Sequence, residues 1–465
     1  MITFYNTLSG RREPFKPLEE GRVKLYTCGP TVYDYSHIGN FRSYVFEDLL
    51  KRFLRFQGFQ VVHVMNITDV DDKTIRGANA RGLTLEEFTS CFIQAFFEDI
   101  KALRISPADH YPRATEHIPD MVRIIQGLLD KRVAYRKDGS VYFSIDRFPG
   151  YGKLSKIDLS KLRTSERIES DEYEKESARD FALWKAPKEG EPRWDSEIGP
   201  GRPGWHIECT AMSTKYLGPR LDIHCGGVDN IFPHHENEIA QSEAYGGRPF
   251  VKYWLHCHHL IVDGEKMSKS KGNFFTLRDL VETRRADPMA IRFLLLSTHY
   301  RKVLNFTFEA LDQARAALGR IQDFLYELEH GSFPAGRTAE ISALLDETKA
   351  KFAEGLSDDL NISLALTALF EMIKRLHIRI KDSQIRADDA REAISLVRSL
   401  DQVLAVLPPP REDKIPDDLL KRIEAREQAR RERDFKLADE IRQELAAAGV
   451  VLEDTKGGVR WKVVR

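Results

Sequence analysis

The middle of the chain holds a set of side chains that suits a metal ion. Cys209 is followed by His234 and Glu238, which lie four residues apart and would share one face of a helix. Pro233 can occupy the first turn of that helix, where its missing N–H costs nothing. Zinc takes sulfur, nitrogen and oxygen ligands in a tetrahedral arrangement. The spacing therefore predicts a zinc site that still needs one donor.

The best remaining donor is Cys28, far upstream. It follows an apolar run at residues 23–27 that is typical of a buried strand, and α/β folds place ligand chemistry at the ends of such strands. The residues alone also allow a simpler interpretation, in which distant cysteines are small buried hydrophobes. The HExxH pattern of metalloproteases is absent, because Ile239 stands four residues after His235.

A phosphate-binding turn is the second chemical signal. The strand at 23–27 leads through a glycine-bearing turn into a helix that opens at His37, and a second strand follows at 60–67. This order predicts the βαβ unit of a nucleotide-binding sheet. Neither GxGxxG nor a Walker loop is present, but the free N–H groups at a helix start favour anions. His37 and Asn40 would add side-chain donors there.

A lysine-rich loop is the third signal. The sequence predicts a strand at 253–262 that runs into a loop at 263–273, where lysines alternate with serines between glycines. Charge-assisted contacts from Lys266 and Lys269 would stabilise the charge on a departing pyrophosphate. From the residues of the loop alone, a generic basic surface loop remains an alternative.

Composition narrows the class of protein. The 465 residues exceed a single core, which predicts roughly two to four domains. A hydrophobic content of 42% with 31% charged residues is typical of a soluble globular protein. The cysteines form no CxxC pair, which favours a reducing compartment, and we expect a cytoplasmic protein. We expect no signal peptide and no membrane-spanning segment. A formal net charge of -1 means that a polyanion must meet a local basic patch.

Further elements follow from periodicity. Residues 84–129 look helical, residues 140–145 look like a strand of an inserted module, and the charged stretch at 163–179 is typical of solvated surface. Apolar residues recur every three or four positions over four helices, at 308–328, 339–354, 362–381 and 390–406. A stiff proline-rich linker at 407–410 then leads into a last segment. That segment is predicted to form a charged helical hairpin and a small β-hairpin, at 418–448 and 450–462.

Two short motifs carry a family resemblance. HIGN at residues 37–40 and KMSKS at residues 266–270 resemble the paired signatures of class I aminoacyl-tRNA synthetases. Asn40 replaces the usual second histidine; it can donate a hydrogen bond but cannot carry charge. Four further segments are similar to cysteinyl-tRNA synthetases: YTCGPTVYD at 26–34, NITDVDDK at 66–73, GWHIEC at 204–209 and FPHHENE at 232–238. The resemblance covers essentially the whole chain.

The resemblance implies a zinc ion held by the same donors that ligand chemistry selects, namely Cys28, Cys209, His234 and Glu238. In this family the metal contacts the substrate thiolate, a soft ligand that zinc prefers to a neutral hydroxyl. Cysteine is thereby separated from serine, which pocket shape alone does poorly. No second, hydrolytic site is then required, and the sequence indicates none.

The resemblance also assigns the remaining site residues. Asp229 matches the carboxylate that holds the substrate α-amino group. Three residues match the wall of the cysteine pocket: Gly29, Thr68 and Trp205. Three others would approach the adenosine: His224, Gly226 and Gly227. The remaining thiols match no metal position and are read as structural: Cys91, Cys225 and Cys257.

The predicted fold is α/β: a class I Rossmann-like catalytic domain with an inserted module, followed by an all-α helical bundle and a small C-terminal α+β domain. The expected catalytic domain covers residues 1–250, with its insertion at about 115–200. The expected domains that follow are a KMSKS-bearing stem-contact region at 251–306, a tRNA-binding bundle at 307–406 and an anticodon-binding domain at 412–465.

The predicted function is ligation of L-cysteine to the 3′ end of tRNA-Cys through a cysteinyl-adenylate, with ATP, Mg²⁺ and one zinc ion per chain. We expect a monomer. The last eleven residues hold four basic side chains and Trp461, which suits an anticodon contact, with core packing of the tryptophan equally open. Two alternatives are a ligase that delivers cysteine to an amino sugar, as in mycothiol biosynthesis, and a non-catalytic zinc protein that binds RNA.

Overall fold

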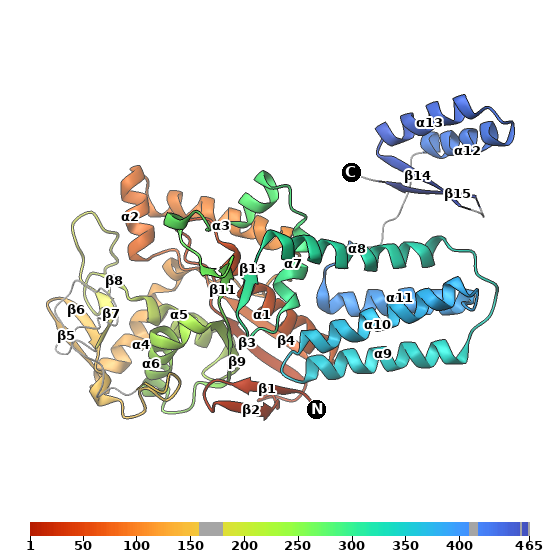
Figure 1. Ribbon diagram of the computed structural model, residues 1–465. Helices are drawn as coiled ribbons and strands as arrows, with labels where there is room; N and C mark the ends of the chain where they lie inside the picture. The colour runs from red at the N-terminus through yellow and green to blue at the C-terminus, as the bar shows by residue number, and fades with distance from the viewer. Residues whose placement is uncertain (158–179, 409–416, 456–457, 464–465) are drawn as a thin grey trace. The chain divides into compact units, whose positions relative to one another are not determined.

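The computed structural model describes residues 1–157, 180–408, 417–455 and 458–463. The chain divides into two compact units (Figure 1). The larger unit holds Met1–Phe324 and Phe333–Val406, and the smaller holds Leu325–Ser332 and Leu407–Arg465. The stretch at 163–179, expected as solvated surface, lies outside the described residues.

A four-stranded parallel sheet forms the centre of the larger unit. The strands lie in the order β10 (Val251–Cys257), β9 (Leu221–Gly227), β3 (Arg22–Thr27) and β4 (Gln60–Met65). Helix α1 (Ile38–Phe56) connects β3 to β4 and packs its apolar side chains against the sheet. This is the predicted βαβ unit. Because all four strands are parallel, their carboxyl ends meet at one edge, where such sheets bind ligands.

An antiparallel sheet is inserted between β4 and β9. Its order is β5 (Ala134–Lys137), β6 (Ser140–Phe143), β7 (Phe181–Lys185) and β8 (Arg202–Pro203). Phe143, Phe181 and Trp184 are buried in one hydrophobic core with residues of α4 (Ile118–Asp130) and α5 (Trp205–Leu217). The module therefore shares its core with α5, the helix that carries Cys209.

The helical prediction for residues 84–129 is only partly right. Helix α2 (Asp72–Arg81) starts earlier. Helix α3 (Leu85–Ala102) is separated from α4 by an irregular segment that ends in a short 3-10 turn at Ala114–His117. Pro107 and Pro112 lie in that segment and lack the N–H that a helix requires. Its backbone pairs instead beside β4, where the Met65 N–H donates to the His110 carbonyl at 3.1 Å.

The helix predicted from Pro233 onward begins later than expected. Helix α6 spans Glu236–Gly246 and is preceded by a π-helical turn over Ile231–His235. Phe232 has an extended backbone, with φ −139° and ψ 131°, which interrupts the helical path before the proline. His234 consequently lies ahead of α6, although its side chain still reaches Glu238 one turn on.

The strand expected at 253–262 is two strands in two different sheets. β10 ends at Cys257, whereas β11 (Leu260–Val262) pairs with β12 (Glu265–Lys266) and β13 (Leu304–Phe306). The His258 N–H donates to the Tyr300 carbonyl at 2.7 Å, which takes the chain out of the parallel sheet. The lysine-rich loop therefore starts from this smaller sheet.

A series of helices follows the sheets: α7 (Pro288–Ser297), α8 (Phe308–His330), α9 (Ala339–Ser357), α10 (Ile362–Lys381) and α11 (Ala387–Leu404). The last four match the helices predicted from periodicity, with ends that differ by a few residues. Arg292 of α7, fully buried, donates to the Asp48 carboxylate of α1 at 2.5 Å and to the Leu404 carbonyl of α11 at 2.8 Å. One buried side chain thus joins three helices of the larger unit.

The smaller unit contains the predicted helical hairpin and β-hairpin. Its helices are α12 (Asp417–Arg431) and α13 (Phe435–Ala447), and its strands are β14 (Val450–Thr455) and β15 (Gly458–Val463). Its core is formed by Ile423, Ile441, Leu445, Val450 and Leu452. The surroundings of the Trp461 side chain lie outside what the structure describes. Within the described ranges of both units, no helix is long and apolar enough to cross a membrane.

Candidate active site and metal centre

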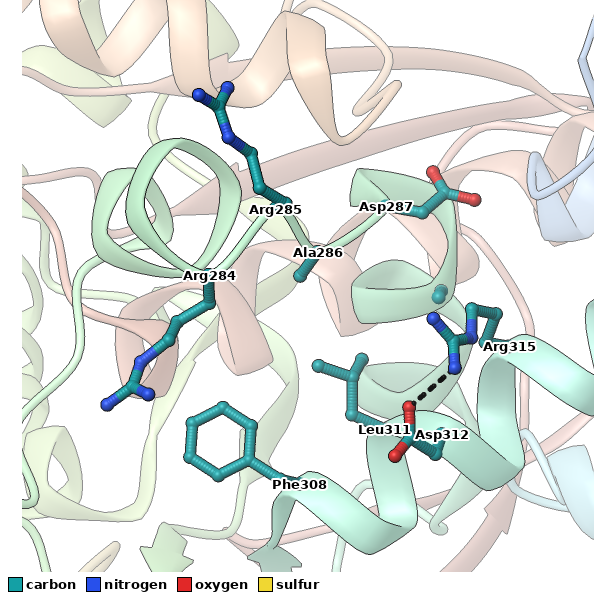
Figure 2. A pocket seen from close by; sticks show the side chains of 9 residues that line it. Arg284, Arg285, Ala286, Asp287, Phe308, Leu311, Asp312 and Arg315 are labelled. Carbon is teal, nitrogen blue, oxygen red and sulfur yellow. Dashed lines mark ion pairs between the residues drawn. The ribbon is translucent and has the colours of Figure 1, made fainter. Parts of the chain in front are cut away.

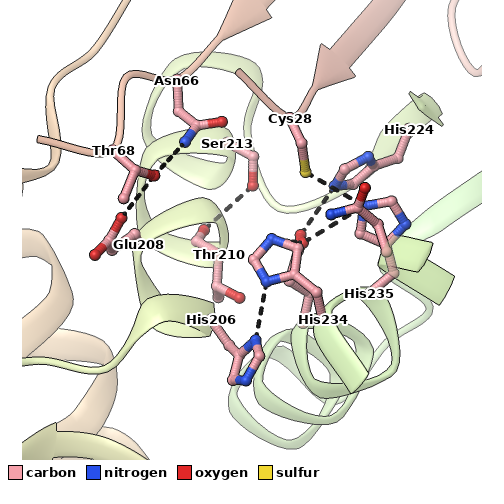
Figure 3. Close-up of polar contacts among 12 residues, drawn as sticks. Cys28, Asn66, Thr68, His206, Glu208, Thr210, Ser213, His224, His234 and His235 are labelled. Carbon is pink, nitrogen blue, oxygen red and sulfur yellow. Dashed lines mark hydrogen bonds and ion pairs between the residues drawn. The ribbon is translucent and has the colours of Figure 1, made fainter. Parts of the chain in front are cut away.

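Four side chains that could hold a metal ion gather at the carboxyl edge of the parallel sheet (Figure 3). They are Cys28, His234, His235 and Glu238, whose ligand atoms all lie within 4.8 Å of one another. Cys28 directly follows β3, and the other three come from the turn before α6 and from its first turn. His234 Nε2 lies 3.1 Å from Glu238 Oε1, and Cys28 Sγ lies 3.3 Å from His235 Nε2. Three of these residues belong to the predicted ligand set.

Cys209, the fourth predicted ligand, lies beside Cys28. The hydrogen bond between the two thiols, together with burial, raises the pKa of Cys28 well above its ordinary value. For Cys209 the same hydrogen bond lowers the pKa, but burial and the Glu238 carboxylate outweigh it and leave the pKa raised. Cys209 is fully buried on α5. Three of the four predicted donors therefore share the cluster with His235, whereas Cys209 adjoins it through Cys28 and is not one of its four members.

The site contains histidines that sequence reasoning did not assign. His235 Nδ1 lies 2.8 Å from His256 Nε2, and His256 Nδ1 lies 2.7 Å from the Thr7 hydroxyl. On the other side, His206 Nδ1 lies 2.9 Å from His234 Nδ1, which leaves His234 Nε2 facing Glu238. The pattern of histidines beside the predicted ligands was visible in the sequence, but their contacts depend on α5, α6 and β10 meeting in space.

The charge states of the two histidines fit a metal ion. Burial lowers the pKa values of His234 and His235 well below the ordinary histidine value, which keeps both imidazoles neutral; neutral imidazole is the form that binds metals. Glu238 Oε1 is buried and accepts no hydrogen bond within the described chain. A buried carboxylate oxygen without a donor is costly, and a cation among these sulfur, nitrogen and oxygen donors would satisfy it. The donor set fits zinc.

His224 was expected at the adenosine. Its ring is fully buried, with Nε2 2.9 Å from Glu238 Oε2, and it stacks on Trp254 at 4.6 Å between ring centroids. The end of β9 that follows it is glycine-rich. A Cβ on Gly226 would come within 2.7 Å of the His235 ring, so this backbone passes close against the histidines.

Of the residues expected around the substrate cysteine, Trp205 contacts the cluster and Gly29 directly follows Cys28. Trp205 stacks on His234 at 4.2 Å between centroids. A Cβ on Gly29 would lie 1.7 Å from the Asn66 carbonyl oxygen, so only glycine fits there. Thr68 is buried and its hydroxyl donates to Glu208 at 3.1 Å. Asp229 has an exposed side chain, as a group that receives a charged amine requires.

The HIGN motif forms the start of α1. His37 is the N-cap: its Nδ1 accepts from the Asn40 N–H at 3.2 Å, while Asn40 Oδ1 accepts from the His37 N–H at 3.1 Å. Because Nδ1 is an acceptor, a neutral His37 carries its proton on Nε2. Burial lowers the pKa of His37, partly against the nearby Asp229 carboxylate, which raises it. The motif thus presents a neutral N–H donor at a helix N-terminus.

The lysine-rich loop is docked on this motif. The Ile38 N–H donates to the Phe275 carbonyl at 3.0 Å, and Met267 packs so closely on Gly39 that an added Cβ would come within 2.8 Å of its methyl group. Lys269 Nζ lies 2.6 Å from the Asp34 carboxylate. Lys266, at the end of β12, is exposed. The two predicted signatures therefore meet, as nucleotide chemistry requires.

A separate small pocket lies between the segment before α7 and the first turns of α8. Figure 2 shows that the side chains of Arg284 and Arg285 extend in different directions, and that Arg315 turns toward Asp312, its ion-pair partner at 3.0 Å. Its cationic groups do not converge on a common point. The pocket adds nothing to the chemistry of the HIGN and KMSKS edge.

Comparison with known families decides the class of protein. A family model described as the class I (C) tRNA synthetase catalytic domain matches residues 14–316, and a cysteinyl-tRNA ligase anticodon binding domain matches residues 413–461. The chain belongs to the cysteinyl-tRNA synthetase family. A DALR domain model also matches residues 351–408 of this cysteinyl-tRNA synthetase family member.

Curated relatives cover the full length. A cysteine–tRNA ligase of Solibacter usitatus is 51% identical over 463 residues, which span 99% of both chains. A cysteine–tRNA ligase of Chlamydia muridarum is 51% identical over 476 residues and covers 100% of both. This member of the cysteinyl-tRNA synthetases is therefore similar to those ligases from end to end.

Solved structures of other synthetases share the fold. The methionyl-tRNA synthetase of Mycobacterium tuberculosis, in complex with methionyl-adenylate, matches with a TM-score of 0.58 at 16% identity, covering 83% of this chain and 90% of its own. The LeuRS of Agrobacterium radiobacter, in a ternary complex with tRNA and LeuAMS, matches with a TM-score of 0.60 at 12% identity, covering 84% of this chain and 85% of its own. The predicted class I Rossmann-like fold of this cysteinyl-tRNA synthetase family member, with its inserted sheet and following helical domains, is confirmed.

Proposed function

We propose that this chain activates L-cysteine with ATP and transfers it to the 3′ end of tRNA-Cys. One observation carries the proposal. The buried thiol, imidazole and carboxylate cluster, the HIGN turn and the docked KMSKS loop all lie at the carboxyl edge of one parallel sheet. A thiol-binding site and a phosphate-binding site on the same edge suit the joining of cysteine to a nucleotide.

The metal is proposed to be zinc, held by Cys28, Cys209, His234 and Glu238. His235 would then hold the Cys28 sulfur by its contact at 3.3 Å rather than act as a ligand. When bound, zinc supplies selectivity, because a thiolate is a far better zinc ligand than the hydroxyl of serine. The protein contributes the orientation: His206 holds the His234 ring, and His224 holds the second oxygen of Glu238.

The substrate cysteine is proposed to lie between Gly29, Thr68 and Trp205. Asp229, exposed beside His37, would hold its α-ammonium group. The carboxylate of the substrate cysteine would then face the HIGN turn at residues 37–40. Its oxygen would attack the α-phosphorus of ATP, and the bond from that phosphorus to the bridging oxygen would break with loss of pyrophosphate. Holding the two reactants in line would lower the barrier, because the entropy cost of bringing them together is met on binding.

The nucleotide is proposed to lie along the start of α1. His37 Nε2–H and the free N–H groups of the helix would bind the α-phosphate, where charge develops. Lys266 and Lys269 would neutralise the departing pyrophosphate, with Mg²⁺ on the phosphates. Gly226 has no side chain and would let the adenosine approach the end of β9, where His224 lies two residues earlier on the same strand. Asn40 would act mainly through its hydrogen bond to the His37 backbone.

The smaller unit is proposed to bind the anticodon. Phe435 is 62% exposed at the turn between α12 and α13, and Arg431, Arg433 and Lys436 are exposed beside it. Guanidinium and ammonium groups bind phosphates, and an exposed aromatic ring can stack on an unpaired base. We also propose the domain limits expected above, together with a monomeric, cytoplasmic enzyme.

The two rivals differ from the proposal in their acceptor. An amino-sugar ligase needs no anticodon-binding module, whereas residues 413–461 of this chain match the family of anticodon binding domains of cysteinyl-tRNA ligases. A non-catalytic zinc protein needs no docked KMSKS loop. The first experiment is charging of unfractionated tRNA with radiolabelled cysteine and ATP. Acid-precipitable cysteine is expected. Absent charging with intact cysteine-dependent pyrophosphate exchange would instead point to a small amine acceptor.

A further inference from the structure

A buried chain of hydrogen bonds connects the Cys28 segment to helix α5, and Figure 3 shows the part from Asn66 to Glu208. The Gly29 N–H donates to Asn66 Oδ1 at 2.9 Å, Asn66 Nδ2 donates to the Thr68 hydroxyl at 3.1 Å, and that hydroxyl donates to Glu208 Oε2 at 3.1 Å. Asn66, Thr68 and Glu208 are at most 2% exposed. We call this set the Asn66 relay.

The direction of the relay is determined by its first member. A backbone N–H can only donate, so the Asn66 oxygen must face Gly29 and its NH₂ must face Thr68. The Thr68 hydroxyl then accepts from Asn66 and has its own hydrogen left for Glu208. Asn66 and Thr68 thus each accept one hydrogen bond and donate another, whereas Glu208 only accepts. Neither aspartate nor leucine, which have nearly the same shape as asparagine, can both accept and donate at position 66 when the aspartate is ionised.

The ends of the relay adjoin the two thiols. Gly29 directly follows Cys28, and Glu208 directly precedes Cys209. Backbone hydrogen bonds between Thr68 and residues 30–32 also join the two loops, at 3.0 and 3.1 Å, but they do not reach α5. Within the described chain, the side chains of Asn66 and Thr68 therefore extend this connection from the Cys28 loop to the helix that carries Cys209.

Stability alone does not account for this arrangement. Glu208 is fully buried, and its Oε1 accepts no hydrogen bond among the described residues. Burying a carboxyl group in this way is unfavourable compared with an apolar side chain of similar size. We therefore expect Glu208 to serve the placement of its neighbour Cys209, at a cost in the stability of the fold.

We propose that Asn66 is a positioning residue that sets the distance between the Cys28 and Cys209 sulfurs and so the fit of the metal site. The inference rests on the proposed zinc site. Outer hydrogen bonds of this kind change metal affinity by about ten- to a hundred-fold. Asn66 would act through the ligands, without contact with the metal or the substrate.

The test is the zinc affinity of the full-length Asn66→Asp protein, measured by competition with a chromogenic chelator. An ionised aspartate can only accept, so the Thr68 hydroxyl either loses its bond to residue 66 or turns to donate to it, and in the second case Glu208 loses its donor. We expect zinc binding to weaken by about ten- to a hundred-fold. In the cobalt-substituted protein, the thiolate-to-metal charge-transfer band should shift or weaken, which a loss of stability alone would not cause.

Matched variants separate positioning from folding. Asn6 is also buried, at 3% exposure, and its side chain likewise bonds to backbone groups; Asn6→Asp should lower stability and leave zinc affinity unchanged. Glu208→Gln keeps an acceptor for Thr68 and should bind zinc as the wild type does. If Asn66→Asp does not fold, Thr68→Val should weaken zinc binding and Thr68→Ser should retain it.

Two results overturn the inference in different ways. Wild-type zinc affinity and an unchanged cobalt spectrum in both Asn66→Asp and Thr68→Val would show that the relay does not position the sulfurs. A wild-type protein that binds no zinc would remove the proposed metal site itself, and the relay proposal with it.

Discussion

Lys269 of the KMSKS loop forms an ion pair with Asp34, with 2.6 Å between Nζ and Oδ2. Asp34 lies on the loop that follows Cys28, so the contact joins the nucleotide-binding loop to the segment that carries a proposed metal ligand. The hydrogen bond to Asp34 raises the pKa of Lys269, and the ammonium group therefore stays charged at neutral pH. In this structure the Asp34 carboxylate is paired with the ammonium group that is proposed to bind the pyrophosphate of ATP.

Lys269→Ala should slow cysteine activation without weakening cysteine binding. The lysine would stabilise charge that develops on pyrophosphate, and removal of one such group costs about 10²- to 10³-fold in rate. Cysteine-dependent pyrophosphate exchange and single-turnover formation of the adenylate measure the effect. An unchanged rate would contradict the assigned role.

Asp34→Asn is the matched control for that variant. Both members of the pair are well exposed, at 68% for Lys269 and 37% for Asp34, and such pairs contribute about 1 kcal/mol or less. Releasing Lys269 from Asp34 should therefore change the KM for ATP by less than about five-fold and leave the activation rate nearly intact.

Cys209→Ser should lose zinc and the discrimination against serine. The hydroxyl replaces a buried sulfur with a poor zinc ligand. Zinc content by atomic absorption and the ratio of cysteine to serine activation are the two measurements. Cys91→Ser is the control, since Cys91 is exposed on α3. Full zinc retention by the Cys209 variant would argue against the proposed ligand set.

His235→Gln distinguishes the two possible fourth ligands. If His235 only supports Cys28, as its contact with that sulfur indicates, the variant should keep zinc with about ten-fold weaker affinity. His234→Gln should lose the metal. If His235→Gln loses as much zinc as His234→Gln, His235 is a ligand. Cys209 would then only support the neighbouring Cys28.

Asn40→Ala should lower both helix stability and activation rate. Its Oδ1 accepts from the His37 N–H, one half of a reciprocal cap whose removal costs about 0.5–2 kcal/mol. The His37 backbone N–H would lose its acceptor, although the ring keeps its bond from the N–H of residue 40, and the looser helix start should raise the KM for ATP. Asn40→His, in which Nδ1 can accept the same bond, should recover most of the activity. Steady-state pyrophosphate exchange and thermal unfolding measure the two effects.

Phe435→Ala should weaken tRNA binding but not amino-acid activation. Stacking of a base on an aromatic ring is worth about 1–3 kcal/mol, which predicts a rise in the KM for tRNA of about ten- to a hundred-fold. Phe435→Trp should retain the interaction, and Leu437→Ala, which removes another exposed apolar side chain, should have little effect. Slower pyrophosphate exchange in Phe435→Ala would contradict this assignment.

Sequence patterns predicted the elements whose signal is local. The strand before Cys28, the helix after His37 and the helices of the bundle depend on apolar periodicity and on capping residues within a few positions. The fold class and family followed from motifs that are themselves contiguous. Predictions failed where long-range pairing competes with periodicity: the segment after Leu103 pairs beside β4, and the chain leaves the parallel sheet at His258.

The metal site shows the same division. Residue chemistry alone selected Cys28, Cys209, His234 and Glu238, because few side chains bind zinc. Only the tertiary structure placed His235 on the Cys28 sulfur and His224 on Glu238, and only it connected Gly29 to Glu208 through Asn66 and Thr68. Apart from the bond between Asn66 and Thr68, these contacts join residues 14 to 207 positions apart. Their geometry is set by how strands and helices pack, which no local sequence pattern encodes.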